Sequence, residues 1–209
     1  MPCIVFSLLF FLAACDGSVP GTDPNLLFSD NFAPGEVGDW QIEGDAAGQT
    51  TLLNENLVIE IHEPNLMQFS TLTTPGFTDF VLEVDARQLQ GDLQSSFGIL
   101  FRMQNPNQFY RYEITGNGMY MLERHNGDGT WSRFVEDWQE TAAIKQGVNQ
   151  VNRLKVTAIG PNISIFVNDT LLFQAADSAY TSGTIALDAG TFTQPGLQVA
   201  FDNLKVRQP

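Results

Sequence analysis

The stretch LEVDARQ, residues 82 to 88, carries charged side chains at alternate positions, namely Glu83, Asp85 and Arg87. On a β-strand alternate residues point to the same face, so the two carboxylates share a face with the arginine. Two carboxylates a few ångströms apart can cleave a glycoside, one as nucleophile and the other as general acid. Gln88 stands where a further acid would complete such a set, and it points to the opposite face. The stretch therefore favours a charged sheet face over a catalytic one.

Two hairpins downstream allow the facing of the next strands to be calculated. A loop at 105–108 predicts that Phe101 lies opposite Tyr112, and a tight turn at 116–117 predicts that Tyr112 lies opposite Met121. Both hairpins set apolar or aromatic residues against each other, as a buried face requires. The residues between them are expected to face outward.

The predicted outward face could bind a sugar. It carries Arg102 opposite Arg111 and Glu113 opposite Tyr120. Opposed arginines repel, so we expect the carboxylates of LEVDARQ and Glu113 to neutralise them and to stay ionised, the reverse of what a general acid requires. Guanidinium donors, a carboxylate acceptor and an aromatic edge suit sugar hydroxyls or a uronic carboxylate.

Two tryptophans in loops beside this sheet could stack on a pyranose ring or could equally belong to the core. No residue is assigned a catalytic role. The candidate ligand-binding residues are Glu83, Asp85, Arg102, Arg111, Glu113, Tyr120, Trp131 and Trp138.

From Leu26 onward the chain predicts one all-β domain over residues 26–209. Turn signals recur about every 8 to 12 residues, and helical periodicity is almost absent, which is typical of a sandwich or barrel. Residues 137–147 are the only helix-tolerant insert. Strands are predicted at 26–32, 50–53, 57–63, 68–72, 79–88, 96–104, 109–115, 118–125, 131–136, 151–159, 162–167, 171–175, 183–189 and 197–206.

This arrangement resembles the concanavalin A-like antiparallel jelly-roll sandwiches, the fold of legume lectins, laminin-G-like modules and several glycoside hydrolases. The resemblance rests on FTDFVLEVDARQ followed by FGILFRM, on YRYEI, and on the closing VAFDNLKV. Within this superfamily the chain is most similar to the domain family named for 3-keto-disaccharide hydrolases. In the family-16 glycosidases, which LEVDARQ resembles, the acidic motif stands nearer to the place of YRYEI, which also disfavours catalysis by LEVDARQ.

The resemblance also suggests a structural calcium ion. Asp30 and Asp202 lie on the first and last long strands, which are neighbours in many such sandwiches. Hard cations bind carboxylates together with backbone carbonyls. The alternative is that both residues only mark strand ends.

The N-terminus predicts export and lipidation. Residues 1–14 are uncharged and apolar, as in a signal peptide, and are too few to span a bilayer. Residues 12–15, LAAC, resemble the lipobox of bacterial lipoproteins, which implies a diacylglyceryl group on Cys15. Residues 15–25 are then a lipidated cysteine and a Gly/Pro/Asp-rich flexible tether.

The charge balance bears on the partners. Twenty-four acids against ten bases give a net charge of -14, which disfavours nucleic acid and anionic lipid. We therefore expect an exported, monomeric lipoprotein of the bacterial envelope that touches the membrane only through its lipid. Its domain is expected to bind a glycan or another envelope component without catalysis. The alternatives are a hydrolase acting on 3-keto-disaccharides and an adhesive, protein-binding module.

Overall fold

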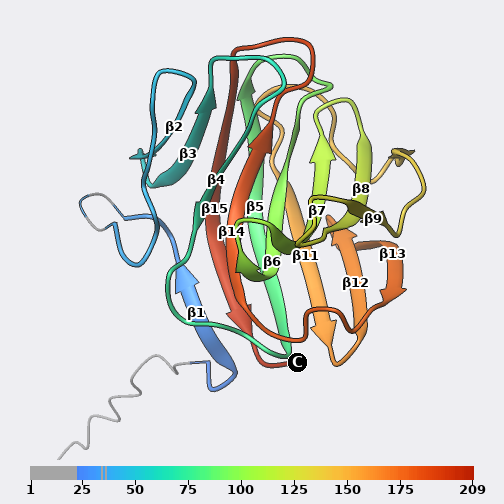
Figure 1. The fold of residues 1–209 in the computed structure, drawn as a ribbon. Helices are drawn as coiled ribbons and strands as arrows, with labels where there is room; N and C mark the ends of the chain where they lie inside the picture. The colour runs from blue at the N-terminus through green and yellow to red at the C-terminus, as the bar shows by residue number, and fades with distance from the viewer. Residues whose placement is uncertain (1–22, 34, 36) are drawn as a thin grey trace, which may run out of the picture.

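Two antiparallel sheets pack face to face in the computed structural model, which describes residues 23–33, 35 and 37–209 (Figure 1). The described residues contain no helix. The all-β, antiparallel sandwich predicted from the turn spacing is therefore confirmed, and all fourteen predicted strands are present.

The eight-stranded sheet runs in the order β13-β12-β11-β5-β15-β3-β2, with β1 also paired to β15. Its strands are β1 (Leu26–Asp30), β2 (Gly48–Leu53), β3 (Asn56–Ile61), β5 (Phe80–Gln90), β11 (Asn152–Ile159), β12 (Asn162–Val167), β13 (Thr170–Ala176) and β15 (Leu197–Arg207).

The seven-stranded sheet runs in the order β10-β8-β7-β6-β14-β4, with β9 also paired to β8. Its strands are β4 (Met67–Thr71), β6 (Ser96–Asn105), β7 (Gln108–Thr115), β8 (Met119–His125), β9 (Trp131–Arg133), β10 (Gln139–Glu140) and β14 (Thr184–Gly190). The helix-tolerant insert at 137–147 forms turns and the short strand β10.

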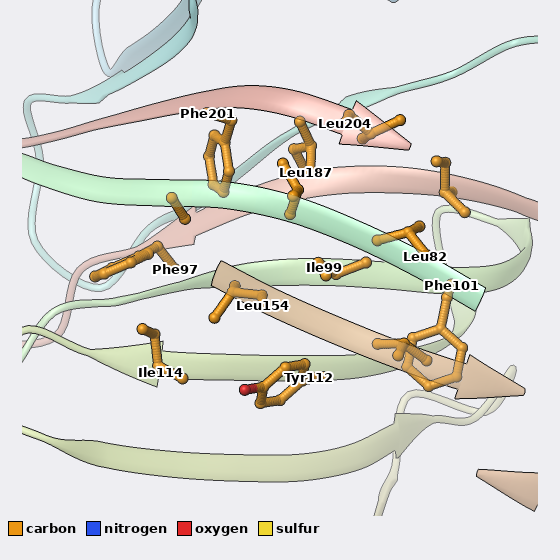
Figure 2. Close-up of a cluster of buried hydrophobic side chains, with 14 of the residues drawn as sticks. Leu82, Phe97, Ile99, Phe101, Tyr112, Ile114, Leu154, Leu187, Phe201 and Leu204 are labelled. Atoms are coloured by element: carbon orange, nitrogen blue, oxygen red, sulfur yellow. The ribbon is translucent and has the colours of Figure 1, made fainter. Parts of the chain in front are cut away.

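The core lies between the sheets and is built from alternate residues of each long strand. Figure 2 shows Phe97, Ile99 and Phe101 of β6 beside Tyr112 of β7 and Leu82 of β5. All five are at most 1% exposed. Each such side chain contributes roughly 1.5 to 3 kcal/mol by leaving water, so this alternation determines which face of each strand is left for function.

The β6–β7 hairpin keeps the predicted faces of β6 up to Phe101, but not the predicted pairs. Phe101 lies opposite Tyr110, and not opposite Tyr112 as expected, because the ladder is interrupted between Phe101 and Asn105. Arg102, within this interruption, has a left-handed φ of 47°. Up to Phe101 the register is therefore shifted by two residues, which preserves the face of each side chain. Beyond the bulge the alternation is reversed, because Met103 packs with Leu100 and not with Phe101.

The β7–β8 hairpin differs from the prediction by one residue, and this reverses the faces of β8. Tyr112 lies opposite Leu122, and Ile114 lies opposite Tyr120. The loop has three residues and ends on Gly118 at a φ of 95°, which is the left-handed glycine of a three-residue hairpin. Tyr120 therefore points inward, contrary to the expected outward position.

The LEVDARQ stretch lies in the other sheet from the strands with which we expected it to share a face. β5 pairs with β11 and β15, while β6 and β7 belong to the seven-stranded sheet. The segment 91–95 crosses from one sheet to the other, starting at Gly91 with a φ of 105°. The prediction that Glu83 and Asp85 neutralise Arg111 is therefore wrong.

The described chain begins inside the expected tether. Arg207 Nε donates to the Asp23 carboxylate at 2.8 Å, and the backbone of Gln208 donates to the carbonyl of Asn25. Residues 23–25 are thus held against β15. The expected signal peptide, Cys15 and the rest of the tether lie outside the described residues, and the described residues hold no helix long and apolar enough to cross a membrane.

Candidate functional site

The outer face of the seven-stranded sheet carries a buried group of charged side chains, which we call the charged cluster: Arg111, Glu113, Glu123 and Asp188. Arg111 Nε donates to Asp188 Oδ2 at 2.8 Å, and Arg111 Nη2 lies 2.7 Å from the same oxygen and 2.8 Å from Glu113 Oε2. The two carboxylates thus meet at one guanidinium nitrogen. The exposed fraction of these four residues is at most 8%.

The position of this cluster follows from the alternation of side chains on β7 and from the one-residue shift in the register of β8. Arg111 and Glu113 alternate with the core residues of β7, and Glu123 lies opposite Arg111 on β8. A glycine on β14 leaves room for the guanidinium, since a Cβ on Gly190 would lie 3.2 Å from Arg111 Nη2. The cluster therefore depends on the consecutive strands β7 and β8 and on β14, which is distant from them in sequence.

Burial decides the protonation of the carboxylates. It raises the pKa of Glu113 to about 7, with Arg111 acting in the opposite direction and Asp188 adding to the rise. Burial also raises the pKa values of Asp188 and Glu123, in each case against the attraction of Arg111. The expectation that carboxylates beside Arg111 stay fully ionised is therefore wrong for Glu113, which can hold a proton near neutral pH.

Arg111 itself remains a cation. Burial acts against its charge, but Asp188 and then Glu113 outweigh burial and hold its pKa above the ordinary value. Asp188 Oδ1 is buried and has no hydrogen-bond partner in the described chain, and Glu113 Oε2 contacts Arg111 outside hydrogen-bond geometry. The cluster therefore retains unused acceptor capacity.

An aromatic pocket lies at one end of this face. It has a volume of about 370 Å³, and its edge is formed by Trp138 and Phe192, whose rings are 6.1 Å apart and nearly perpendicular. Phe192 is 42% exposed. The other lining residues are Gln94, Thr115, Asn117 and Met119. We call this the Trp138 platform.

A second aromatic group lies at the opposite end of the same face. Trp131 is 40% exposed, and its ring lies 4.5 Å from that of His125 and 5.8 Å from that of Phe109. His125 also stacks on Phe109 at 5.2 Å. We call this the Trp131 platform.

Four predicted ligand residues do not lie on this face, and two of them, Arg102 and Tyr120, come from the strands of the same sheet. Arg102 is completely buried, and its guanidinium donates to the carbonyls of Thr78, Gly160 and Tyr180. It joins loops at one end of the sandwich, and it does not lie opposite Arg111. Tyr120 points inward, where its hydroxyl donates to the carbonyl of Leu172 at 3.3 Å. The bulge in β6 and the longer β7–β8 turn account for both errors.

Glu83 and Asp85 lie on the outer face of the eight-stranded sheet. Arg207 Nη1 lies 3.0 Å from Glu83 Oε2, and Arg153 Nε donates to Asp85 Oδ1 at 2.9 Å. The side chains of both arginines are at least 30% exposed. These two carboxylates therefore belong to solvated surface ion pairs, away from the charged cluster.

The two aspartates expected to hold calcium have other partners. Asp30 accepts the backbone NH of Phe32 at 2.7 Å and the indole NH of Trp40 at 2.9 Å. Asp202 lies opposite Asp85 and accepts hydrogen bonds from Asn203. Within the described residues no three acids, histidines or cysteines converge as metal ligands would. The first and last strands, β1 and β15, are neighbours as expected, and a calcium ion at this pair stays a prediction.

Sequence reasoning missed Glu123, Asp188, Phe192, His125 and Phe109. Asp188 could have been noticed because it interrupts the apolar run IALDAG, where an acid needs a buried partner. Nothing local in the sequence marks that partner as Arg111.

The chain is similar in fold to several solved structures. The carbohydrate-binding module CBM66 from Bacillus subtilis aligns with a TM-score of 0.65 and 18% identity, over 81% of this chain and 96% of that one. The laminarinase catalytic domain from Thermotoga maritima aligns with a TM-score of 0.64 and 11% identity, over 88% and 98%. The Bacillus licheniformis β-glucanase gives 0.63 and 10%, over 87% and 98%. The predicted concanavalin A-like jelly roll is confirmed.

The sequence also assigns the family within this class. The family model described as the 3-keto-alpha-glucoside-1,2-lyase-like domain matches residues 27–207, so the chain belongs to that family. This confirms the similarity drawn from LEVDARQ, YRYEI and VAFDNLKV. No curated protein sequence matches the chain.

Proposed function

We propose that the chain is a carbohydrate-binding domain and that the outer face of its seven-stranded sheet is the binding surface. The observation that carries this proposal is the pair of exposed aromatic platforms, one on either side of the charged cluster. Sugar rings stack on exposed aromatic faces, and their hydroxyls need a few well-placed polar groups. The shared fold with a carbohydrate-binding module supports the proposal.

The proposal is tested by removing the Trp138 platform. Phe192→Ala, in which an exposed side chain is truncated, should lower glycan affinity severalfold without a change in thermal stability. Leu171→Ala is a matched control, because Leu171 is 47% exposed but lies on β13 of the other sheet. Binding that both variants retain equally would reject this face.

A second candidate is an enzyme of the kind that the family's description names, a lyase acting on 3-keto-α-glucosides. It is favoured by the pKa of Glu113, about 7, which lets one carboxyl accept and return a proton near neutral pH. Glu113 would take the proton from carbon 2 of the sugar, which the neighbouring ketone acidifies. The bond from carbon 1 to the leaving oxygen would break as a double bond forms between carbons 1 and 2, and that oxygen would receive a proton.

This candidate is tested by incubating the protein with a 3-keto-α-glucoside and following the ultraviolet absorbance of the conjugated product. Glu113→Gln should abolish product formation. Glu83→Gln is the matched control, because its carboxylate lies on the opposite sheet. A wild-type protein that yields no product rules out the lyase and leaves the binding proposal intact.

We further propose that the domain is displayed as a monomer on the bacterial envelope by a lipid on Cys15. The motif LAAC and the apolar run before it support this placement. Labelling of bacteria that express the protein with an alkyne fatty acid should modify wild type and not Cys15→Ser. An unlabelled wild-type protein would contradict the anchor.

A further inference from the structure

The two aromatic platforms lie on one face and are separated by most of the length of β7. Thr115 lines the pocket of the Trp138 platform, and Phe109 contacts the ring of Trp131. These two residues have the same parity on β7 and stand six residues apart. At about 3.3 Å per residue the platforms are thus about 20 Å apart along the strand, which is longer than a disaccharide.

The surface between the platforms is a polar floor. It consists of Arg111 and Glu113, which lie between Phe109 and Thr115 on β7, together with Glu123 on the neighbouring β8 and Asp188 on β14. Strand β6 separates β14 from β7, and its Gly98 stands between Asp188 and Glu113. The exposed fraction of the residues falls from 40% at Trp131 to 8% or less in the floor and rises to 42% at Phe192. A ligand that rests on both platforms would cross above this floor.

The charge of the floor selects against anions. Three carboxylates face one buried guanidinium, and Arg111 is already engaged by Asp188 and Glu113. Arg133, whose side chain is 56% exposed, lies 3.8 Å from Glu123 and balances part of this charge. An acidic sugar would lose solvation and meet carboxylates, whereas neutral hydroxyls can donate to them.

We propose that the site takes a linear, uncharged glycan longer than a disaccharide, with one end on the Trp138 platform and the other on the Trp131 platform. This inference rests on the proposed binding function and specifies its ligand class. Under this proposal Trp131 not only packs on His125 and Phe109 but also binds the far end of the glycan.

The test is calorimetry with linear gluco-, manno- and fructo-oligosaccharides of two to six residues, and with oligogalacturonides of the same lengths. Affinity for the neutral series that binds should rise with length beyond the disaccharide. Trp131→Ala should weaken the longest ligand by roughly fivefold, since one aromatic contact is worth about 1 kcal/mol. It should weaken the disaccharide much less, because the Trp138 platform alone can hold a ligand of that length. Trp131→Phe should recover most of the loss.

The outcomes separate the two proposals. Equal affinity for the disaccharide and the hexasaccharide, an equal loss for all lengths in Trp131→Ala, or tighter binding of oligogalacturonides would overturn this inference while the binding function stands. Absence of binding to every neutral and acidic series would contradict the binding function itself. Unchanged far-ultraviolet circular dichroism in each variant verifies the fold.

Discussion

The outer faces of the two sheets use the same chemistry in opposite surroundings. On the eight-stranded sheet, Arg153 pairs with Asp85 and more than half of the arginine side chain is exposed. On the seven-stranded sheet, Arg111 pairs with Asp188 and Glu113 while all three are nearly buried. Water screens the first set, so these ion pairs contribute little to the stability of the fold. Burial of the second set strengthens the interactions between its charges and shifts their pKa values.

The largest contrast is expected from deletion of the two arginines. Arg111→Ala leaves buried carboxylates without their counter-charge and should lower the free energy of unfolding by about 3 to 5 kcal/mol. Arg153→Ala removes a surface pair and should cost no more than about 1 kcal/mol. Urea denaturation of both variants measures the difference. Similar losses would show that the charged cluster is no more dependent on burial than the surface pairs.

The next effect is on pH dependence. Because burial raises the pKa of Glu113 from 4.5 to about 7, the folded state binds its proton more tightly than the unfolded state. Stability from this group is full below pH 4.5 and is lost as pH rises through about 7, a decline of up to about 3 kcal/mol.

Glu113→Gln, measured by urea denaturation across that range, should remove this decline relative to wild type. Asp85→Asn is its control on the other sheet and should leave the decline in place. A wild-type profile that Glu113→Gln does not change would contradict a buried, proton-binding carboxyl.

A smaller effect concerns the space beside Arg111. Gly190→Ala places a methyl group 3.2 Å from Arg111 Nη2 and 3.0 Å from Ser96 Oγ, closer than most such contacts. The neighbours must yield, so we expect a stability loss of about 1 kcal/mol, with weaker glycan binding if the floor is displaced. A Cβ on Gly160, in the β11–β12 turn, would meet nothing within 4 Å. Gly160→Asn is therefore a control in open space, because asparagine tolerates the positive φ of this position.

The fold could be predicted from the sequence because turn chemistry and alternation are local. Turns containing glycine, asparagine or proline mark the ends of the strands. The strand β10 was not predicted, because two residues are too few to show an alternating pattern of apolar and polar side chains. The faces predicted for β6 are correct up to Phe101, since a two-residue shift preserves parity. They are wrong beyond the bulge at Arg102, where Met103 packs with Leu100. The faces predicted for the side chains of β8 are wrong, because the turn that ends at Gly118 has three residues and shifts the register by one.

The site could be predicted only in part. Arg111, Glu113, Trp131 and Trp138 do lie on one face, as the alternation indicated, and their binding role stays a prediction. Asp188 could not be placed because its strand pairs with β6 across more than eighty residues of chain. Glu83 was misplaced for the related reason that no local signal tells which sheet a strand joins.

Binding of glycan by the outer face of the seven-stranded sheet can be followed through the indole NH signals of the three tryptophans during titration with a neutral linear oligosaccharide. Trp131 and Trp138 lie on the two platforms, whereas Trp40 is 4% exposed and donates its indole NH to Asp30. We expect the signals of Trp131 and Trp138 to shift and saturate together while that of Trp40 stays fixed. Saturable binding that leaves both platform signals unmoved would contradict binding at this face.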